Sequence, residues 1–136
     1  MKRAILAMSG LLFAASAATA TVGGNADRQA QPRVLAPIEG GLWEITQLGS
    51  DARPRRLCLR DVSVLAQYEH MGRECTRVTV NESGKKALVR YTCTAGGFGT
   101  SEFEVVTPRS ITVKTQGIKN GYPFNRTLLA RRTGSC

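Results

Sequence analysis

The chain has 136 residues, of which 42% are hydrophobic and 21% are charged. This length suits one domain with a modest hydrophobic core and leaves no room for a second large one. The 19 basic residues exceed the 10 acidic ones and give a formal net charge of +9. Such an excess either attracts a protein to anionic surfaces or serves its solubility alone.

The first twenty residues predict a secretory signal peptide. Lys2 and Arg3 form a basic start, an apolar stretch follows, and Ala18-Thr19-Ala20 is a small-x-small cleavage site. The alternative, a membrane span, needs roughly 20 apolar residues, which neither this stretch nor any later segment provides. We therefore expect cleavage near Ala20 and a periplasmic or secreted protein that does not span a membrane.

After cleavage the chain would begin with a leader. Residues 21–37 are rich in Gly, Ala, Gln and Pro and show no period, which predicts a flexible segment. Residues 38–136 then form a single predicted domain. Loss of Lys2 and Arg3 leaves 17 basic and 10 acidic residues in the processed chain, a net charge of +7.

The first elements of that domain are two strands and a helix. Alternating residues predict a strand over 41–48, and a short strand follows over 56–59. Asp61 is placed to cap a helix over Val62 to Met71, and Gly72 is placed to end it. This is the one helix that the sequence predicts.

The rest of the chain is predicted to be strands. A hairpin with a Ser83-Gly84 loop would set Val80 opposite Ala87 and Glu82 opposite Lys85, so that an apolar residue faces an apolar one and each charge faces its opposite. Residues 95–99 form a turn, 100–106 and 110–115 a second hairpin, and 123–132 the last strand. We expect a mainly β protein, a small antiparallel sandwich or barrel of six to seven strands with one short helix.

Four cysteines lie beyond the predicted cleavage site, and an even number in a short exported chain predicts two disulfides. They are Cys58, Cys75, Cys93 and Cys136. A zinc site would show paired C-x-x-C spacing, whereas the gaps here are 17, 18 and 43 residues. We expect no metal and no cofactor.

Three disulfide pairings are possible. In the favoured hairpin register Cys75 and Cys93 lie on opposite faces, and a disulfide needs Cβ atoms about 3.5–4.5 Å apart. This favours Cys58–Cys75 with Cys93–Cys136, although a shift of one residue or a bulge would reverse the argument. Under every pairing Cys136, the last residue, is bonded and holds the chain end against the sheet.

The order of several short motifs resembles a family of exported bacterial proteins known only as a domain of unknown function. The motifs are Gly41-Leu42-Trp43-Glu44, Cys58-Leu59, the two cysteines around Ser83-Gly84, and the ending from Arg132 to Cys136. The likeness covers about residues 38–136. This chain departs from the family pattern in its short, arginine-rich first loop and in the helix start at Asp61. The resemblance implies an exported, disulfide-bonded β domain and no particular activity.

An arginine cluster is the strongest charged feature, because the guanidinium fork matches phosphate and carboxylate groups. It comprises Arg53, Arg55, Arg56 and Arg60. The alternative is a solvated loop. Trp43 is a further candidate if it stacks on a ligand, although a core position is the simpler interpretation. Nucleic-acid binding would require aromatic residues among the basic ones, and none lies there.

Chemistry for catalysis is sparse in this sequence, so we lean against an enzyme and predict no catalytic residue. His70 is the single histidine, and neither a nucleophile elbow nor a zinc-protease motif appears. The leading hypothesis is a periplasmic binding or interaction module of the cell envelope, with an anionic envelope component or another envelope protein as partner. The alternatives are an envelope hydrolase with an unrecognised site and a purely structural role.

Overall fold

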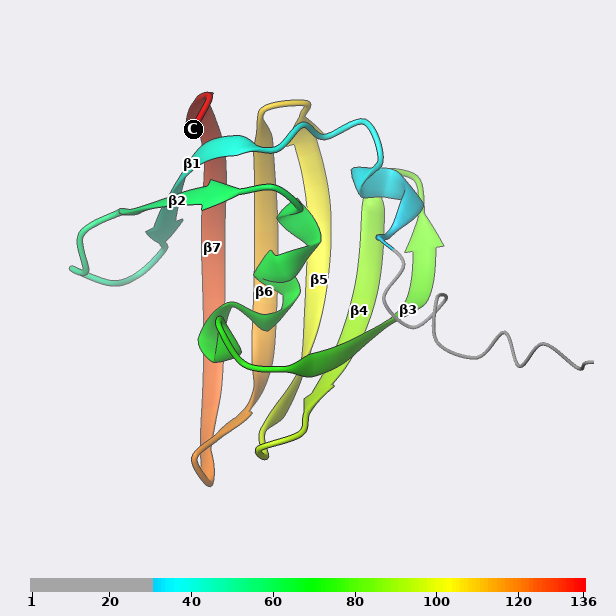
Figure 1. Ribbon diagram of the computed structural model, residues 1–136, viewed down its shortest axis with the longest axis vertical. Helices are drawn as coiled ribbons and strands as arrows, with labels where there is room; N and C mark the ends of the chain where they lie inside the picture. The colour runs from blue at the N-terminus through cyan, green and yellow to red at the C-terminus, as the bar shows by residue number, and fades with distance from the viewer. Residues whose placement is uncertain (1–30) are drawn as a thin grey trace, which may run out of the picture.

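The computed structural model describes residues 31–136. Seven antiparallel strands form one sheet in the order β2-β1-β7-β6-β5-β4-β3 (Figure 1). The elements in chain order are η1 (Arg33–Leu35), β1 (Gly41–Gln47), β2 (Arg55–Leu59), η2 (Val62–His70), β3 (Cys75–Ser83), β4 (Lys86–Cys93), β5 (Phe98–Thr107), β6 (Ser110–Lys119) and β7 (Tyr122–Gly134).

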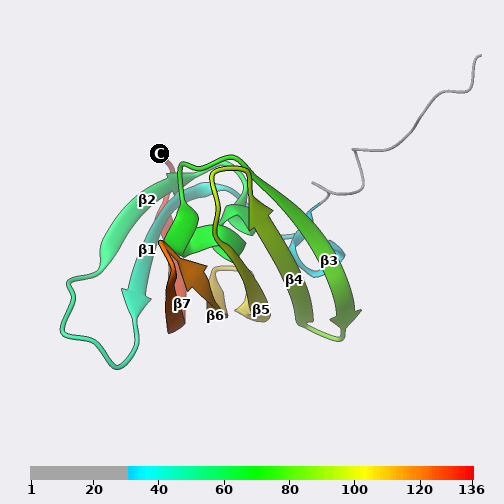
Figure 2. The same cartoon turned by 90° about the horizontal axis from the view of Figure 1, so that it is seen from below.

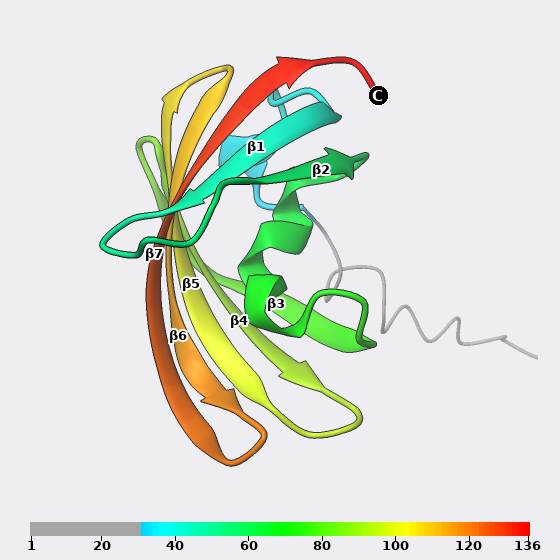
Figure 3. The same cartoon turned by 90° about the vertical axis from the view of Figure 1, so that its left-hand side faces the viewer.

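The sheet is strongly curved and η2 lies across its concave side (Figures 2 and 3). The mainly β prediction is confirmed, but the architecture is neither a two-sheet sandwich nor a closed barrel. The edge strands β2 and β3 do not pair, and η2 connects them across the concave face. The helix covers the apolar face that a second sheet would otherwise cover, so one sheet and one helix enclose the core.

The core lies between the concave face of the sheet and η2. Alternate strand residues point inward, among them Trp43, Ile45 and Phe103, each at most 1% exposed. From η2, Val62, Leu65 and Ala66 meet them. The alternation in β1 predicted from the sequence is confirmed, and the concave face buries the larger side chains.

The predicted helix over Val62 to Met71 is present as η2, but it is a 3₁₀ helix with non-helical backbone angles at Gln67. Its predicted cap is confirmed: Asp61 accepts hydrogen bonds from the Ser63 backbone nitrogen at 2.8 Å and from the Ser63 hydroxyl at 2.7 Å. Side chains on both sides of Gln67 are buried, among them Leu65 and His70.

The β3–β4 hairpin has a different register from the predicted one. Ser83 lies opposite Lys86, so Gly84 and Lys85 form the turn, and a bulge between Thr79 and Asn81 shifts the remaining pairs. Cys75 consequently lies directly opposite Cys93. The predicted pairing of Val80 with Ala87 does not occur, because Ala87 lies opposite Glu82. Val80 is instead 49% exposed on this edge strand. Phe98 and Gly99, expected in a turn, begin β5.

The disulfides join Cys75 to Cys93 and Cys58 to Cys136, so the favoured pairing was wrong. The shift in register brings Cys75 and Cys93 to the same face, with their Cα atoms 3.9 Å apart. Leu42 in β1 pairs with Cys58 on one side and Gly134 on the other. The two residues after Gly134 therefore cross the end of β1 to reach β2. The expectation that Cys136 is bonded is confirmed.

Ordered structure begins before Ile38, where the sequence placed the end of the leader. Leu35 is fully buried in η1, and the backbone nitrogen of Val34 donates to Glu82 Oε1 at 3.2 Å. Arg33 forms an ion pair with the same carboxylate at 2.9 Å. The predicted signal peptide, residues 1–20, lies outside the described residues. Within residues 31–136 no helix is long and apolar enough to cross a membrane.

Candidate anion-binding pocket

A cavity of about 310 Å³ lies between the β1–β2 loop, the end of η2 and the adjoining ends of β6 and β7. It is lined by Ile45, Gln47, Ala52, Arg53, Arg55, Tyr68, Glu69, Lys119 and Arg126. We call it the cationic pocket, because four of the lining side chains are basic and one is acidic. These residues come from five separate segments of the chain, so only the folded protein assembles them.

The carboxylate of Glu69 pairs with two of the four basic residues of the pocket, Lys119 and Arg126. Lys119 Nζ and Arg126 Nε each lie 3.5 Å from one of its oxygens, and the Glu69 side chain is only 15% exposed. Among residues 31–136, no carboxylate lies within ion-pair distance of Arg53 or Arg55. The pocket therefore keeps two guanidinium groups with no anionic partner on the protein.

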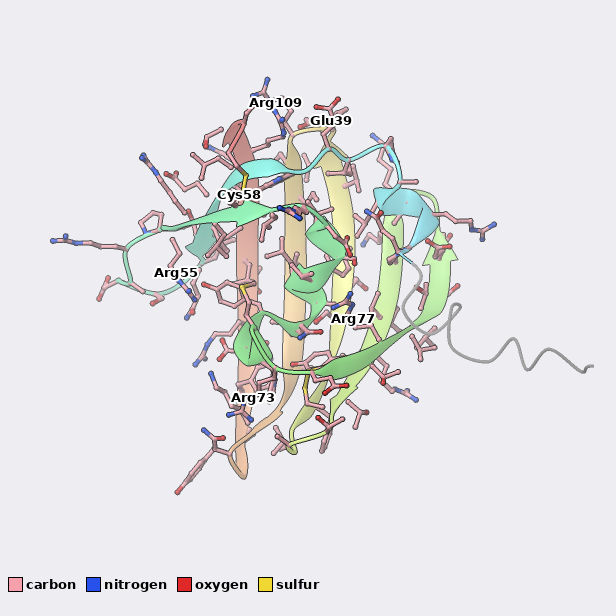
Figure 4. All side chains as sticks on the ribbon, viewed as in Figure 1. Glu39, Arg55, Cys58, Arg73, Arg77 and Arg109 are labelled. Atoms are coloured by element: carbon pink, nitrogen blue, oxygen red, sulfur yellow. A yellow bond between two sulfur atoms is a disulfide. The ribbon has the colours of Figure 1, made fainter. Side chains whose placement is uncertain are left out.

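Arg55 is positioned by an aromatic ring. Its guanidinium carbon lies 5.6 Å from the centroid of the Tyr68 ring in η2. In β2, Arg55 lies directly opposite Ile45, whose buried side chain points to the concave side, so Arg55 lies on that side too (Figure 4). The ring orients the planar cation and leaves its donors free to bind an anion.

Buried hydrogen bonds fix the η2 residues next to the pocket. Ser101 Oγ lies 2.6 Å from the Ala66 carbonyl oxygen and 2.7 Å from Thr115 Oγ1. Because a carbonyl oxygen only accepts, the Ser101 hydroxyl donates to Ala66 and accepts from Thr115. These contacts join the middle of η2 to β5 and β6. They hold the turn that comes directly before Tyr68 and Glu69 in the chain.

His70 anchors the end of η2. Its ring is 1% exposed, and Nδ1 lies 3.0 Å from the hydroxyl of Tyr91. A neutral imidazole of either tautomer can form this hydrogen bond, because the tyrosine hydroxyl both donates and accepts. Nε2 packs against Gly97, where an added Cβ atom would collide with the ring.

The protonation of this cluster follows from burial. Burial lowers the pKa of His70, and the charges of Arg73 and Lys119 lower it further, against the opposing effect of Glu69. Burial also raises the pKa of Tyr91 to about 12. These shifts favour a neutral histidine and a protonated tyrosine at neutral pH.

The structure divides the predicted arginine cluster. Arg53 and Arg55 line the cationic pocket, whereas the next residue, Arg56, points to the opposite face of the sheet and pairs with Glu44 at 3.4 Å. Arg60 is exposed beyond the end of β2 and does not line the pocket. Trp43 is fully buried in the core, which agrees with the simpler interpretation of this residue, and it does not line the pocket.

Besides Arg53 and Arg55, the pocket has four charged or aromatic lining residues that were not candidates from the sequence: Tyr68, Glu69, Lys119 and Arg126. None of them belongs to a motif, and the two basic ones come from strands far along the chain from the arginine-rich loop. The one sequence signal was the excess of basic residues over acidic ones, which does not reveal position. In the described part of the chain, no group of three or more His, Cys, Asp or Glu residues could hold a metal ion.

The fold and the pocket define a class of small β proteins. A curved, open β-sheet is covered on its concave side by η2, two disulfides hold the chain, and one pocket on that side is lined by basic residues. The chain belongs to the family described as Protein of unknown function (DUF3617), whose sequence model matches residues 35–136. The expected membership of a domain of unknown function is thus confirmed; export, the GLWE motif and the cysteine ending as family traits stay predictions. No curated protein and no solved structure matches the chain.

Proposed function

We propose that this domain is an exported binding module and that it holds an anionic group of its ligand in the cationic pocket. The observation that carries the proposal is the pair Arg53 and Arg55, which face the same cavity without an anionic partner in residues 31–136. Lys119 and Arg126 add positive charge, of which Glu69 neutralises one unit. An anion entering the pocket meets an excess of three positive charges from these five side chains.

The shape and chemistry of the pocket favour a compact, multiply charged group such as a phosphate, a pyrophosphate or a paired carboxylate. Guanidinium groups bind such groups through two parallel hydrogen bonds, and these are stronger than hydrogen bonds between neutral partners. The volume of about 310 Å³ suits a small group, not a large apolar ligand. A ligand could therefore be a larger envelope molecule that places only its charged group here.

Two features support the exported location within this proposal. Both disulfides are formed, and disulfides persist in oxidising compartments such as the periplasm. The signal peptide predicted over residues 1–20, with cleavage near Ala20, would direct the chain there. The alternative of a hydrolase finds no support from His70, whose buried ring a substrate cannot reach.

The proposal can be tested with pyrophosphate and inorganic phosphate as probes in a calorimetric titration. Arg55→Gln should weaken pyrophosphate binding by about tenfold or more, since one charge-assisted hydrogen-bonded contact is worth roughly 1.5–3 kcal/mol. Arg56→Gln is the matched control, because it removes the same charge from the adjacent residue on the opposite face of β2.

Equal weakening by the two variants would show that only net charge matters and would contradict a site at the pocket. Absence of measurable binding of either probe by the wild-type protein at low salt would also contradict the proposal. The expected result is a loss with Arg55→Gln alone, together with a decline in wild-type affinity as salt rises, because salt screens exposed charges.

A further inference from the structure

One end of the molecule carries large apolar side chains in the open. The β4–β5 and β6–β7 hairpins end side by side there (Figures 1 and 3). Tyr122, at the start of β7, is 76% exposed, and Phe98, at the start of β5, is 53% exposed. Large apolar side chains that gather in the open at one end of a protein are a feature of surfaces that contact a partner or a membrane. We call this end the hairpin tip.

The apolar residues of the hairpin tip lie on both faces of the sheet. Phe98 pairs with Ile118, and Ile118 pairs with Pro123, so these three residues share the convex face. Tyr122 pairs with Lys119, whose ion pair with Glu69 of η2 places both on the concave side. A flat protein partner would cover only one of these faces. A medium that surrounds the tip, such as the headgroup region of a bilayer, covers both.

Basic side chains lie at the same end of the molecule. Lys119 and Arg126 lie on the concave side, and Arg73 donates from Nη2 to Asn120 Oδ1 in the β6–β7 turn at 3.3 Å. Figure 4 shows Arg73 below η2, toward this end of the sheet. The carboxylates nearby are Glu69, which is already paired, and Glu74, which precedes β3. The basic residues exceed the acidic ones at the tip, which suits an anionic surface.

We propose that the hairpin tip docks on an anionic lipid bilayer. Phe98, Tyr122 and Ile118 enter the headgroup region, where amphipathic aromatic residues are favoured, and the neighbouring basic residues contact anionic headgroups. A hollow of about 440 Å³ beside Phe98, lined also by Ile118, Pro123 and Phe124, offers room for lipid methylene groups. This orientation turns the cationic pocket, which shares Lys119 and Arg126, toward the membrane surface.

The inference goes beyond the proposed anion site, because exposed apolar residues outside the pocket carry it. The test measures sedimentation of the protein, processed by its own host, with vesicles of phosphatidylglycerol and phosphatidylcholine. Phe98→Ser/Tyr122→Ser should reduce the partition coefficient by about tenfold, the amount expected when two partly inserted aromatic side chains are lost. Val80→Ser/Val106→Ser is the matched control, since those exposed valines lie toward the opposite end of the sheet and are 49% and 52% exposed.

We expect the control to bind vesicles as the wild-type protein does, and we expect all binding to fall when phosphatidylcholine replaces the anionic lipid. Equal binding by the Phe98→Ser/Tyr122→Ser variant and the control would overturn the docking proposal. So would equal wild-type binding to neutral and anionic vesicles. Pyrophosphate binding without vesicle binding would overturn docking and leave the proposed anion site intact. Vesicle binding without pyrophosphate binding would support docking and overturn the anion site.

Discussion

The guanidinium group of Arg55 lies over the ring of Tyr68, 5.6 Å from the ring centroid to the guanidinium carbon. This contact joins the edge strand β2 to η2 and forms one wall of the cationic pocket. It explains how an exposed arginine on a short edge strand can keep a defined orientation without an ion pair. The hydrogen bonds of Ser101 and His70 hold η2 in turn, so the pocket wall depends on the interior of the domain.

The role of Tyr68 can be tested by removing its ring. Tyr68→Leu should weaken pyrophosphate binding by about two- to fivefold, because an exposed cation–π contact is worth roughly 0.5–1 kcal/mol. The measurement is a calorimetric titration beside Tyr122→Leu, the same substitution at a tyrosine outside the pocket. An unchanged affinity in Tyr68→Leu would mean that the ring does not position Arg55.

The two disulfides should contribute unequally to stability. The Cys58–Cys136 bond closes a loop with a sequence separation of 78 residues, and the Cys75–Cys93 bond one of 18. The chain-entropy relation assigns about 4.5 and about 3 kcal/mol to these loops. Denaturant unfolding of Cys58→Ser/Cys136→Ser should therefore show a loss about 1 kcal/mol greater than Cys75→Ser/Cys93→Ser. A larger loss from the shorter loop would contradict this ranking, and non-reducing peptide mapping would check the pairing itself.

Leu35 should behave as a core residue although it lies in the predicted leader. Leu35→Ala should lower the free energy of unfolding by about 2–5 kcal/mol, the usual effect of removing a buried leucine side chain. Leu48→Ala is the control, because Leu48 is 49% exposed and the same substitution there should change little. Similar effects at the two positions, measured by denaturant unfolding, would show that the domain begins after Leu35.

Stability should fall on mild acidification because of His70. Its pKa is lowered in the folded protein from an unfolded value of 6.5, chiefly by burial. The unfolded chain therefore takes up a proton first, and the free energy of unfolding declines as the pH falls below about 6.5 toward the folded pKa. Above that range the residue contributes no pH dependence.

Denaturant unfolding at a series of pH values between about 7.5 and 5 measures this effect, and His70→Asn supplies the comparison. The variant should be less stable at every pH, since it disturbs the contact with Tyr91, but its stability should change less with pH over this range. Parallel pH profiles for the two proteins would contradict the assignment of a depressed pKa to His70.

Local sequence signals predicted the elements of this fold well. Alternation identified β1, and Asp61 followed by Ser63 marked the start of η2, because these features depend on neighbours along the chain. The register of β3 and β4 could not be found in this way. The bulge near Val80 places apolar side chains outward on an edge strand, against the rule that apolar pairs should face the core.

The site was only partly predictable, for the same physical reason. Arg53, Arg55 and Arg56 were equal candidates from their charge. Side chains alternate along β2, so Arg55 and Arg56 lie on opposite faces of the sheet. Lys119 and Arg126 reach the pocket through the β6–β7 hairpin and its pairing with β1, a long-range arrangement that no short motif encodes. The error in the disulfide pairing followed directly from the one-residue error in register.

The most direct test of the central proposal maps where an anion binds on the wild-type protein. Backbone amide NMR shifts should be followed during a titration with pyrophosphate at low salt. We expect saturable shifts concentrated at Arg53, Arg55 and the adjoining residues Lys119 and Arg126. Residues around Leu42 and Glu44, on the face of the sheet where Arg56 lies, should change little. Shifts that fail to saturate, or that gather instead around Thr100 and Gln116 on the convex face, would contradict the cationic pocket as the binding site.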